Sequence, residues 1–230
     1  MRVLAVDTSS ERGSVCVAEN GRTLAEIRVA SSVQQAERLF RSVEFLFSCV
    51  PFKLADVDLF VAARGPGSFT GLRIGLAAME GFAAAHHKPS VGISTLAALA
   101  WKSGIQDHWV APTIDARRGE IYGGLYRRVG GRLTEERPPV VLPPEDWFRS
   151  LPDGTIYFCG DAAERHWALL VRPGWVLHKM SLYLAGTMAE LAETPNREPL
   201  EPLYVRKTDA EITREQRHQH ESVTGPNSKG

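Results

Sequence analysis

Short apolar runs alternate with longer amphipathic stretches along the chain, which is the order of an α/β protein. Residues 2–7 are apolar and rich in β-branched side chains, a pattern that predicts a buried strand. Asn20 and Gly21 form the dipeptide preferred in tight hairpin turns, so the runs on either side should pair as strands. In the first half we expect strands at 2–7, 13–19, 22–29, 57–63 and 91–93 and helices at about 33–49, 70–87 and 95–103.

The second half repeats this order of elements. Its first strand, 109–115, ends in Asp115, just as the first strand of the chain ends in Asp7. A three-stranded unit followed by alternating helices and strands gives a mixed sheet covered by helices, so two copies predict a two-lobed α/β protein. The other expected elements are strands at 119–127, 132–141, 155–159 and 174–178 and helices near 144–149, 161–170 and 181–193.

The pattern divides the chain into three parts. We expect a first lobe at 1–106, a second related lobe at 107–213 and a polar tail at 214–230. A helix that begins at Thr208 should stop before about residue 222. The tail has too few large apolar residues to offset its ordering entropy by burial, so we expect it to be disordered.

Composition narrows the class of protein. Of 230 residues, 43% are hydrophobic and 23% are charged, an ordinary globular mixture. The 27 lysines and arginines balance 27 aspartates and glutamates, so no net charge draws the chain toward nucleic acid. The apolar start is too short for a signal peptide or a membrane span, which favours a cytoplasmic protein without a membrane partner. The three cysteines are widely separated and form no zinc or redox motif.

A glycine-rich segment from Arg64 to Gly75 joins a predicted strand to a predicted helix. Ser68 or Thr70 can cap that helix, whose free N–H groups could hold an anion. The glycines lack the Lys-Ser/Thr pair of a Walker loop and the spacing of a dinucleotide fingerprint. Two alternatives remain open: a phosphate site, or a tight turn with close helix packing at Gly71 and Gly75.

The helix expected at 70–87 is apolar on nearly every side, and such a helix must be covered on two faces. One face can meet the sheet, and the other needs a second helix or another protein. On the helix at 33–49, Phe45 lies opposite the apolar stripe and among arginines, a composition that suits an interface. The alternative is that the domain's own helices cover both faces. The residues we predict at a partner interface are Arg38, Arg41, Phe45, Leu72, Leu76, Met79 and Ala83.

The run GPGSFTGLRIG resembles the signature loop of the bacterial TsaB family. One departure from the family pattern is on the first long helix, where Gln35 stands in place of a histidine. Four other segments resemble the family in the same order, namely 4–10, 91–96, 114–122 and 202–206. The residues of the signature loop are Gly65, Pro66, Gly67, Ser68, Phe69, Thr70, Gly71 and Gly75.

This resemblance implies a two-lobed fold of the actin-like, sugar-kinase-like (ribonuclease H-like) class. It also implies a non-catalytic subunit that binds and activates a catalytic paralogue, TsaD, with the helices at 33–49 and 70–87 packed against their counterparts. The assembly transfers a threonylcarbamoyl group to an adenosine beside the tRNA anticodon, and a small ATPase, TsaE, joins it. We expect tRNA to meet this chain only indirectly, and a homodimer to form when the catalytic partner is absent.

The catalytic paralogue holds a metal through a His-x-x-x-His pair, and the resemblance places Thr95 and Leu99 at those two positions. A hydroxyl is a poor ligand and leucine is none, so we expect no metal, no cofactor and no catalytic residue. The adjacent His86 and His87 point in different directions from a helix and do not replace the pair.

Two other classes of protein are alternatives. In an autonomous ATP-dependent kinase, Asp7, Asp115 and Asp161 could hold Mg²⁺ through their carboxylates. Against this, Asp7 is followed by Thr8 and two serines rather than by a glycine-rich phosphate loop. In a peptidase, Ser68 would be the candidate nucleophile, but the chain has neither a Gly-x-Ser-x-Gly elbow nor a His-Glu-x-x-His motif.

Overall fold

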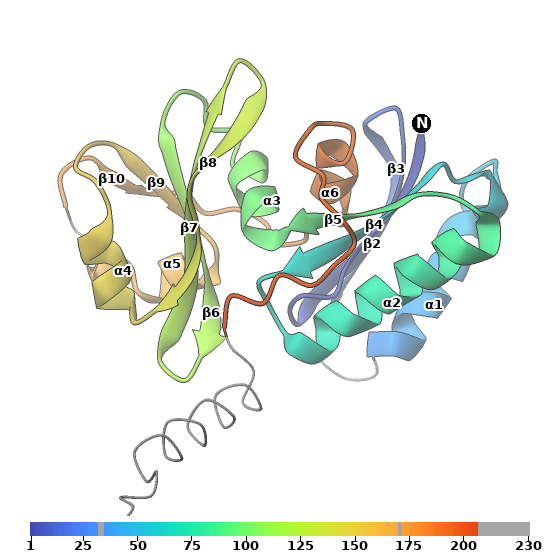
Figure 1. Ribbon diagram of the computed structural model, residues 1–230, viewed down its shortest axis with the longest axis horizontal. Coiled ribbons are helices and arrows are strands. Elements are labelled where there is room, and N and C mark those ends of the chain that lie inside the picture. Colours follow the sequence, from blue (N-terminus) through green and yellow to red (C-terminus); the bar gives the residue numbers. More distant parts are fainter. Residues whose placement is uncertain (32–34, 170–171, 207–230) are drawn as a thin grey trace, which may run out of the picture.

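The computed structural model describes residues 1–31, 35–169 and 172–206, which form two five-stranded sheets with helices around and between them (Figure 1). The tail predicted at 214–230 and the helix expected from Thr208 lie outside the described residues. The strands are β1 (Arg2–Asp7), β2 (Arg12–Glu19), β3 (Arg22–Ala30), β4 (Leu59–Gly65), β5 (Ser90–Ser94), β6 (Trp109–Arg117), β7 (Glu120–Val129), β8 (Arg132–Leu142), β9 (Ile156–Cys159) and β10 (Trp175–Leu177). The helices are α1 (Gln35–Ser48), α2 (Phe69–His86), α3 (Thr95–Lys102), α4 (Pro144–Ser150), α5 (Asp161–Arg165) and α6 (Ala185–Leu191), with 3₁₀ turns at Leu54–Asp56 and Trp167–Leu169.

These elements confirm the alternation predicted from the hydrophobic pattern, and most bounds agree closely. The helix expected at 161–170 is shorter, because α5 ends at Arg165 and a 3₁₀ turn follows it. The helix expected at 181–193 begins later, at Ala185. Just before it, the backbone carbonyl of Tyr183 accepts a hydrogen bond from the ammonium group of Lys102 instead of taking part in a helical turn.

The two sheets share one topology. The first has the order β3-β2-β1-β4-β5 and the second the order β8-β7-β6-β9-β10. In each sheet, the three strands that come first in the sequence pair antiparallel with one another. The last two strands extend the sheet in parallel, with β4 beside β1 in the first sheet and β9 beside β6 in the second. The repeat predicted from the order of elements is therefore confirmed at the level of strand pairing.

The two faces of the first sheet are covered by helices from distant parts of the chain. Neighbouring residues of a strand point to opposite faces of the sheet, so Val6 of β1 and Ser14, which pairs with the next residue Asp7, face opposite sides. On one face, Val6 lies next to the position of Gly75 in α2, and α1 packs beside α2. On the other face, the hydroxyl of Ser14 accepts a 3.0 Å hydrogen bond from the backbone N–H of Ala185, at the start of α6. The first sheet is thus completed by a helix near the end of the described chain.

Helix α3 lies between the two sheets and packs against strands of both (Figure 1). One continuous apolar core runs from the first sheet through α3 to Val110, Tyr126 and Leu133 of the second sheet. Helix α3 belongs to the lobe proposed at 1–106 but also packs on the second sheet, and α6 belongs to the lobe proposed at 107–213 but packs on the first sheet. The division at 106/107 stays a proposal, with α6 packed on the sheet of the first lobe.

After α6 the chain runs between the lobes as an extended strap, residues 198–206 (Figure 1). Glu198 exchanges two backbone hydrogen bonds with Gly92 of β5, at 2.7 and 3.0 Å. Further along, the N–H of Leu203 donates to the carbonyl of Arg64 at 2.7 Å. Arg206 then forms an ion pair with Glu120 on β7. The strap therefore contacts the end of the first sheet and one strand of the second.

Candidate functional site

The glycine loop follows β4 and leads directly into α2. Ser68 is the N-cap of α2, because its hydroxyl accepts a 3.3 Å hydrogen bond from the backbone N–H of Gly71. The other predicted cap, Thr70, lies inside the first turn of the helix. The loop is also tied to the end of β1, since the N–H of Ser68 donates to the carbonyl of Ser9 at 2.7 Å.

Close packing explains two of the glycines in this loop. A Cβ at Gly67 would lie 2.6 Å from the carbonyl oxygen of Ser9, and one at Gly75 would lie 2.5 Å from the hydroxyl oxygen of Thr8. That hydroxyl donates a 2.7 Å hydrogen bond to the carbonyl of Gly71, so it is not free to move away. The loop and helix thus rest directly on the segment after β1. This geometry favours the tight-turn alternative over a phosphate site.

Asp7 ends β1 and is buried. One carboxylate oxygen accepts a 2.9 Å hydrogen bond from the N–H of Ser9, and the other has no hydrogen-bond partner among the described residues. Burial raises the pKa of Asp7 from 3.8 to about 6, although the hydrogen bonds with Ser9 and the charge of Lys102 act to lower it. A carboxylate closed off in this way is not placed to bind a Mg²⁺–nucleotide complex.

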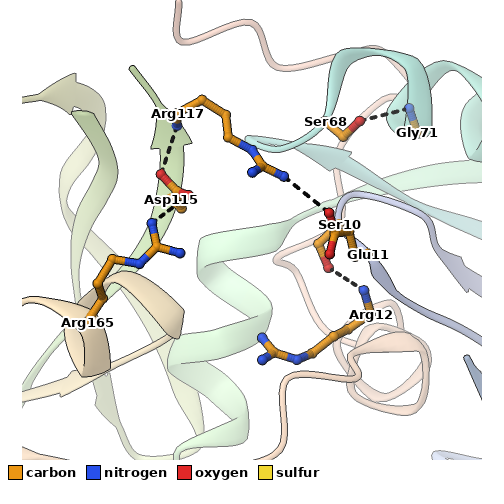
Figure 2. Close-up of polar contacts among 8 residues, drawn as sticks. All are labelled: Ser10, Glu11, Arg12, Ser68, Gly71, Asp115, Arg117 and Arg165. Atoms are coloured by element: carbon orange, nitrogen blue, oxygen red, sulfur yellow. Dashed lines mark hydrogen bonds and ion pairs between the residues drawn. The ribbon is translucent and has the colours of Figure 1, made fainter. Parts of the chain in front are cut away.

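The matching aspartate of the second lobe is held by arginine (Figure 2). Asp115 accepts hydrogen bonds from the N–H of Arg117 at 2.9 Å and from the guanidinium of Arg165 at 2.8 Å. Partial burial acts to raise the pKa of Asp115, but these hydrogen bonds and charges outweigh it and lower the pKa. The third carboxylate of the kinase alternative, Asp161, accepts the N–H of Asp115 at 3.1 Å. The three aspartates therefore have separate roles inside the fold and do not form a common ion site.

Ser68, the serine of the peptidase alternative, uses its hydroxyl to cap α2. Thr95 and Leu99, at the positions matched to the metal-binding histidines, are both buried in α3. Across the described ranges, no group of three His, Cys, Asp or Glu side chains could hold a metal ion. No helix in the same ranges is long and apolar enough to cross a membrane.

The part of the interface that was predicted on α2 is wrong. Leu72, Leu76, Met79 and Ala83 are buried within the chain itself, and Met79 has no exposed surface at all. They form the face of α2 that packs on the first sheet, so they cannot be a partner surface. The sequence could not orient this helix, because its two opposite faces are both apolar.

The exposed side of α1 and α2 is formed by other residues, which we call the α1–α2 outer face. On α1, Phe45 is 61% exposed and Phe40 is 51% exposed. The ring of Phe40 lies where the two helices meet, with its centroid 5.8 Å from that of Phe82. The exposed side also carries charged residues such as Arg41 and Glu80, and the name is kept for its apolar and small residues, Phe40, Phe45, Ala77, Gly81 and Ala84, all exposed.

The two arginines predicted beside Phe45, Arg38 and Arg41, differ in exposure and in the neighbours they contact. Arg41 is exposed and forms a 2.6 Å ion pair with Glu37 one helical turn earlier. Arg38 is half-buried and lines a small hollow of about 40 Å³ between α1 and the strands β2 and β3. Arg41 and Phe45 remain candidates for a partner surface, whereas Arg38 faces the edge of the sheet.

An exposed stack at the start of α2 was missed from the sequence. The guanidinium of Arg73 lies 3.8 Å from the ring centroid of Phe69 and donates a 3.2 Å hydrogen bond to the hydroxyl of Tyr204 in the strap. The centroids of the Phe69 and Tyr204 rings are 5.5 Å apart. The sequence shows Phe69 and Arg73 one helical turn apart in α2. No local pattern predicts that Tyr204 lies beside them.

The chain resembles known proteins over most of its length. The sequence profile of the family described as "TsaD: tRNA N6-adenosine threonylcarbamoyltransferase" matches residues 29–166. The tRNA threonylcarbamoyladenosine biosynthesis protein TsaB of Escherichia coli is 30% identical over 225 residues, which are 91% of this chain and 96% of that protein. The protein of the same name from Bacillus subtilis is 30% identical over 168 residues, 72% of this chain and 73% of that protein.

Two solved structures from Pseudomonas aeruginosa have the same fold, each with a TM-score of 0.75. One is described as a protein with similarity to peptidase YeaZ and is 27% identical, covering 89% of this chain and 99% of its own. The other, YeaZ, is 26% identical and covers 88% and 99%. With the repeated topology above, they confirm the α/β fold of two related lobes expected from the sequence. The chain belongs to the TsaB family of tRNA threonylcarbamoyladenosine biosynthesis proteins.

Proposed function

We propose that the chain is the non-catalytic subunit of a complex that makes threonylcarbamoyladenosine in tRNA. In this role it binds a TsaD-like catalytic subunit and activates it for transfer of the threonylcarbamoyl group to the adenosine beside the anticodon. The observation that carries the proposal is the apolar α1–α2 outer face, which the described part of this chain leaves uncovered. The buried Asp7 and the Thr95/Leu99 pair support an accessory role rather than a catalytic one.

The shape of the outer face suits a partner that presents helices. Ala77, Gly81 and Ala84 are small and exposed along one side of α2, and a Cβ at Gly81 would have nothing within 4 Å. Small side chains let a second helix approach closely, at the roughly 8–10 Å that packed helices keep. Phe40 and Phe45 then supply the large apolar contacts that interfaces use as anchors.

Further partners belong to the same proposal. A TsaE-like ATPase would join the complex, and the outer face would pair with a second copy of the chain when the catalytic subunit is absent. Both fit a protein of the cytoplasm. For docking to activate the partner, the partner's competent state must bind this chain more tightly than its idle state does.

Co-expression with the catalytic paralogue of the same genome tests the proposal. We expect tRNA threonylcarbamoylation to require both chains, with no activity from this chain alone. Gly81→Trp should block close approach of the partner helix and abolish both complex formation and activity, while the isolated variant stays folded. Arg132→Trp, at the exposed first residue of β8, is the matched control and should behave as the native chain.

Two results would contradict the proposal. Full activity of the catalytic paralogue without this chain would remove the accessory role. Normal complex formation by Gly81→Trp, measured by isothermal titration calorimetry, would place the interface away from the α1–α2 outer face.

A further inference from the structure

Three arginines lie around the place where the two lobes face each other, and we call them the interlobe arginine cluster: Arg12, Arg117 and Arg165 (Figure 2). Arg117 reaches from the second lobe to Glu11 of the first, with 3.4 Å between guanidinium and carboxylate. Arg12 is the next residue after Glu11. Arg165 is linked to Arg117 through Asp115, which accepts hydrogen bonds from the guanidinium of Arg165 and the backbone N–H of Arg117.

The backbone at the centre of this cluster is in an unfavourable conformation. Three consecutive residues have positive φ angles: Arg117 at 64°, Arg118 at 55° and Gly119 at 77°. Left-handed backbone costs about 1–2 kcal/mol for a residue with a side chain, and glycine avoids this cost. The hairpin thus holds arginines at two positions where glycine or asparagine would be less strained. Such strain tends to persist where the side chains have a role in binding.

The cluster remains well exposed despite its ion pairs. The side chain of Arg117 is 74% exposed and that of Arg165 is 58% exposed. Each guanidinium has five N–H donors, and a single carboxylate engages only a few of them. For Arg12, the described residues provide no ion pair to the guanidinium, so the carboxylates beside the cluster, Glu11, Asp115 and Asp161, leave many of its N–H donors free for a ligand.

We propose that the interlobe arginine cluster binds the phosphate backbone of the tRNA that the complex modifies. This inference rests on the proposed function, which brings tRNA to the assembly, and it replaces the expectation that tRNA meets this chain only indirectly. Guanidinium forks match phosphate oxygens, and Glu11 and Asp115 hold two of the forks in place. Because the whole chain has no net charge, the attraction must be local, and the exposed guanidinium groups of this cluster are placed to supply it.

Binding of tRNA by the assembled complex tests the inference. The double variant Arg12→Gln/Arg117→Gln removes two cations without adding opposite charge. We expect the affinity for the tRNA transcript to fall about tenfold at moderate salt, since each phosphate contact adds to binding through counterion release. The slope of log affinity against log salt concentration should shrink by about 1 for each phosphate that is no longer neutralised. Fluorescence anisotropy of labelled tRNA across a salt series measures both quantities.

Two further variants separate charge from structure. Arg117→Lys keeps the cation and should retain most of the affinity and of the salt slope, although it changes the Glu11 contact. Arg132→Gln removes a cation at the first residue of β8, away from the cluster, and should leave both quantities unchanged. Calorimetry without tRNA should show that the double variant binds the catalytic subunit as tightly as the native chain does.

The possible failures are distinguishable. If the native complex neither forms nor modifies tRNA, the proposed function itself is wrong. If the native complex works and the double variant binds tRNA with unchanged affinity and salt slope, the arginine cluster is not an RNA contact. Weaker binding of the catalytic subunit by the double variant, with tRNA affinity unaltered once the complex is formed, would identify the cluster as a protein contact and overturn the RNA assignment.

Discussion

Asp7 and Asp115 occupy the same place in the two lobes, and each accepts a 2.9 Å hydrogen bond from the backbone N–H two residues further on. Their surroundings differ. Asp7 is buried near Lys102, whereas Asp115 is held by the guanidinium of Arg165. Burial raises the pKa of the first carboxyl to about 6, and the hydrogen bonds and charges around the second outweigh burial and lower its pKa. One repeated turn therefore has opposite electrostatic consequences in the two lobes.

The raised pKa of Asp7 predicts a loss of stability with rising pH. Between its unfolded value of 3.8 and about 6, the folded chain holds this proton more firmly than the unfolded chain does. The free energy of unfolding therefore falls as pH rises through this window, by about 3 kcal/mol for a shift of two pKa units. Asp7→Asn keeps the acceptor for Ser9 and should remove this dependence. Urea unfolding of both proteins from about pH 4.5 to about pH 7.5 measures it, and parallel curves would contradict the assignment.

Asp115 should show the reverse dependence. Its lowered pKa stabilises the folded chain above the unfolded pKa, and this contribution is lost as pH falls through the folded value. Asp115→Asn should therefore differ from the native chain most at neutral pH and converge with it in acid. The same unfolding series provides the measurement, and a variant that diverges only in acid would show that the sign is wrong.

Close packing of the glycine loop predicts which glycines tolerate a side chain. Gly75→Ala places a methyl group against the hydroxyl of Thr8, which should lower the free energy of unfolding by about 1–3 kcal/mol. Gly81→Ala, on the same helix, meets nothing within 4 Å and should raise stability by about 0.5–1 kcal/mol. Thermal unfolding of the two variants compares them directly. Equal effects would mean that helix propensity, not packing on Thr8, determines the choice of glycine.

The two faces of the partner helices should respond differently to truncation. Met79→Ala opens a cavity in the core and should cost about 2–5 kcal/mol of folding stability. Phe45→Ala removes an exposed ring and should leave the free energy of unfolding within about 0.5 kcal/mol of the native value. We expect it to weaken binding of the catalytic subunit nonetheless. Chemical unfolding gives the first comparison and calorimetry the second; a Phe45→Ala chain that binds normally would exclude that ring from the interface.

The ion pair between Arg206 and Glu120 should brace the two lobes. Arg206→Glu places two carboxylates together and should lower stability, and Glu120→Arg in the same chain should restore most of the loss. Because both side chains are partly exposed, we expect a coupling of about 1 kcal/mol or less. A double-mutant cycle by urea unfolding measures the coupling. Additive effects of the two substitutions would show that the pair does not couple the lobes.

Much of the fold could be read from local patterns. The strands, the hairpin at Asn20-Gly21, the cap at Ser68 and the repeat marked by Asp7 and Asp115 all follow from residues close together in the sequence. What the sequence could not orient was α2, because a helix that is apolar on both sides gives no preference for the face that meets the sheet. Met79 was therefore predicted at a partner surface and is in the core.

Contacts between segments that are distant in the sequence could not be predicted from local hydrophobic and turn patterns. Tyr204 meets Phe69 and Arg73 only because the strap crosses the first turn of α2. Arg117 meets Glu11 only because the two lobes face each other. Neither pairing leaves a periodic signal, since each depends on how whole sheets are placed. The candidate site thus combines a loop that is visible in the sequence with neighbours that only the tertiary structure reveals.

The exchange of helices between the lobes has a consequence for synthesis of the chain. The face of the first sheet that α6 covers cannot be closed until residues 185–191 have left the ribosome, long after β1 to β5 have been made. At about 5–20 residues per second, the delay lasts on the order of ten seconds. Throughout that time the nascent first lobe exposes an apolar sheet surface to solvent. It should therefore depend on a holding chaperone, and a fragment cut at residue 106 should aggregate instead of folding.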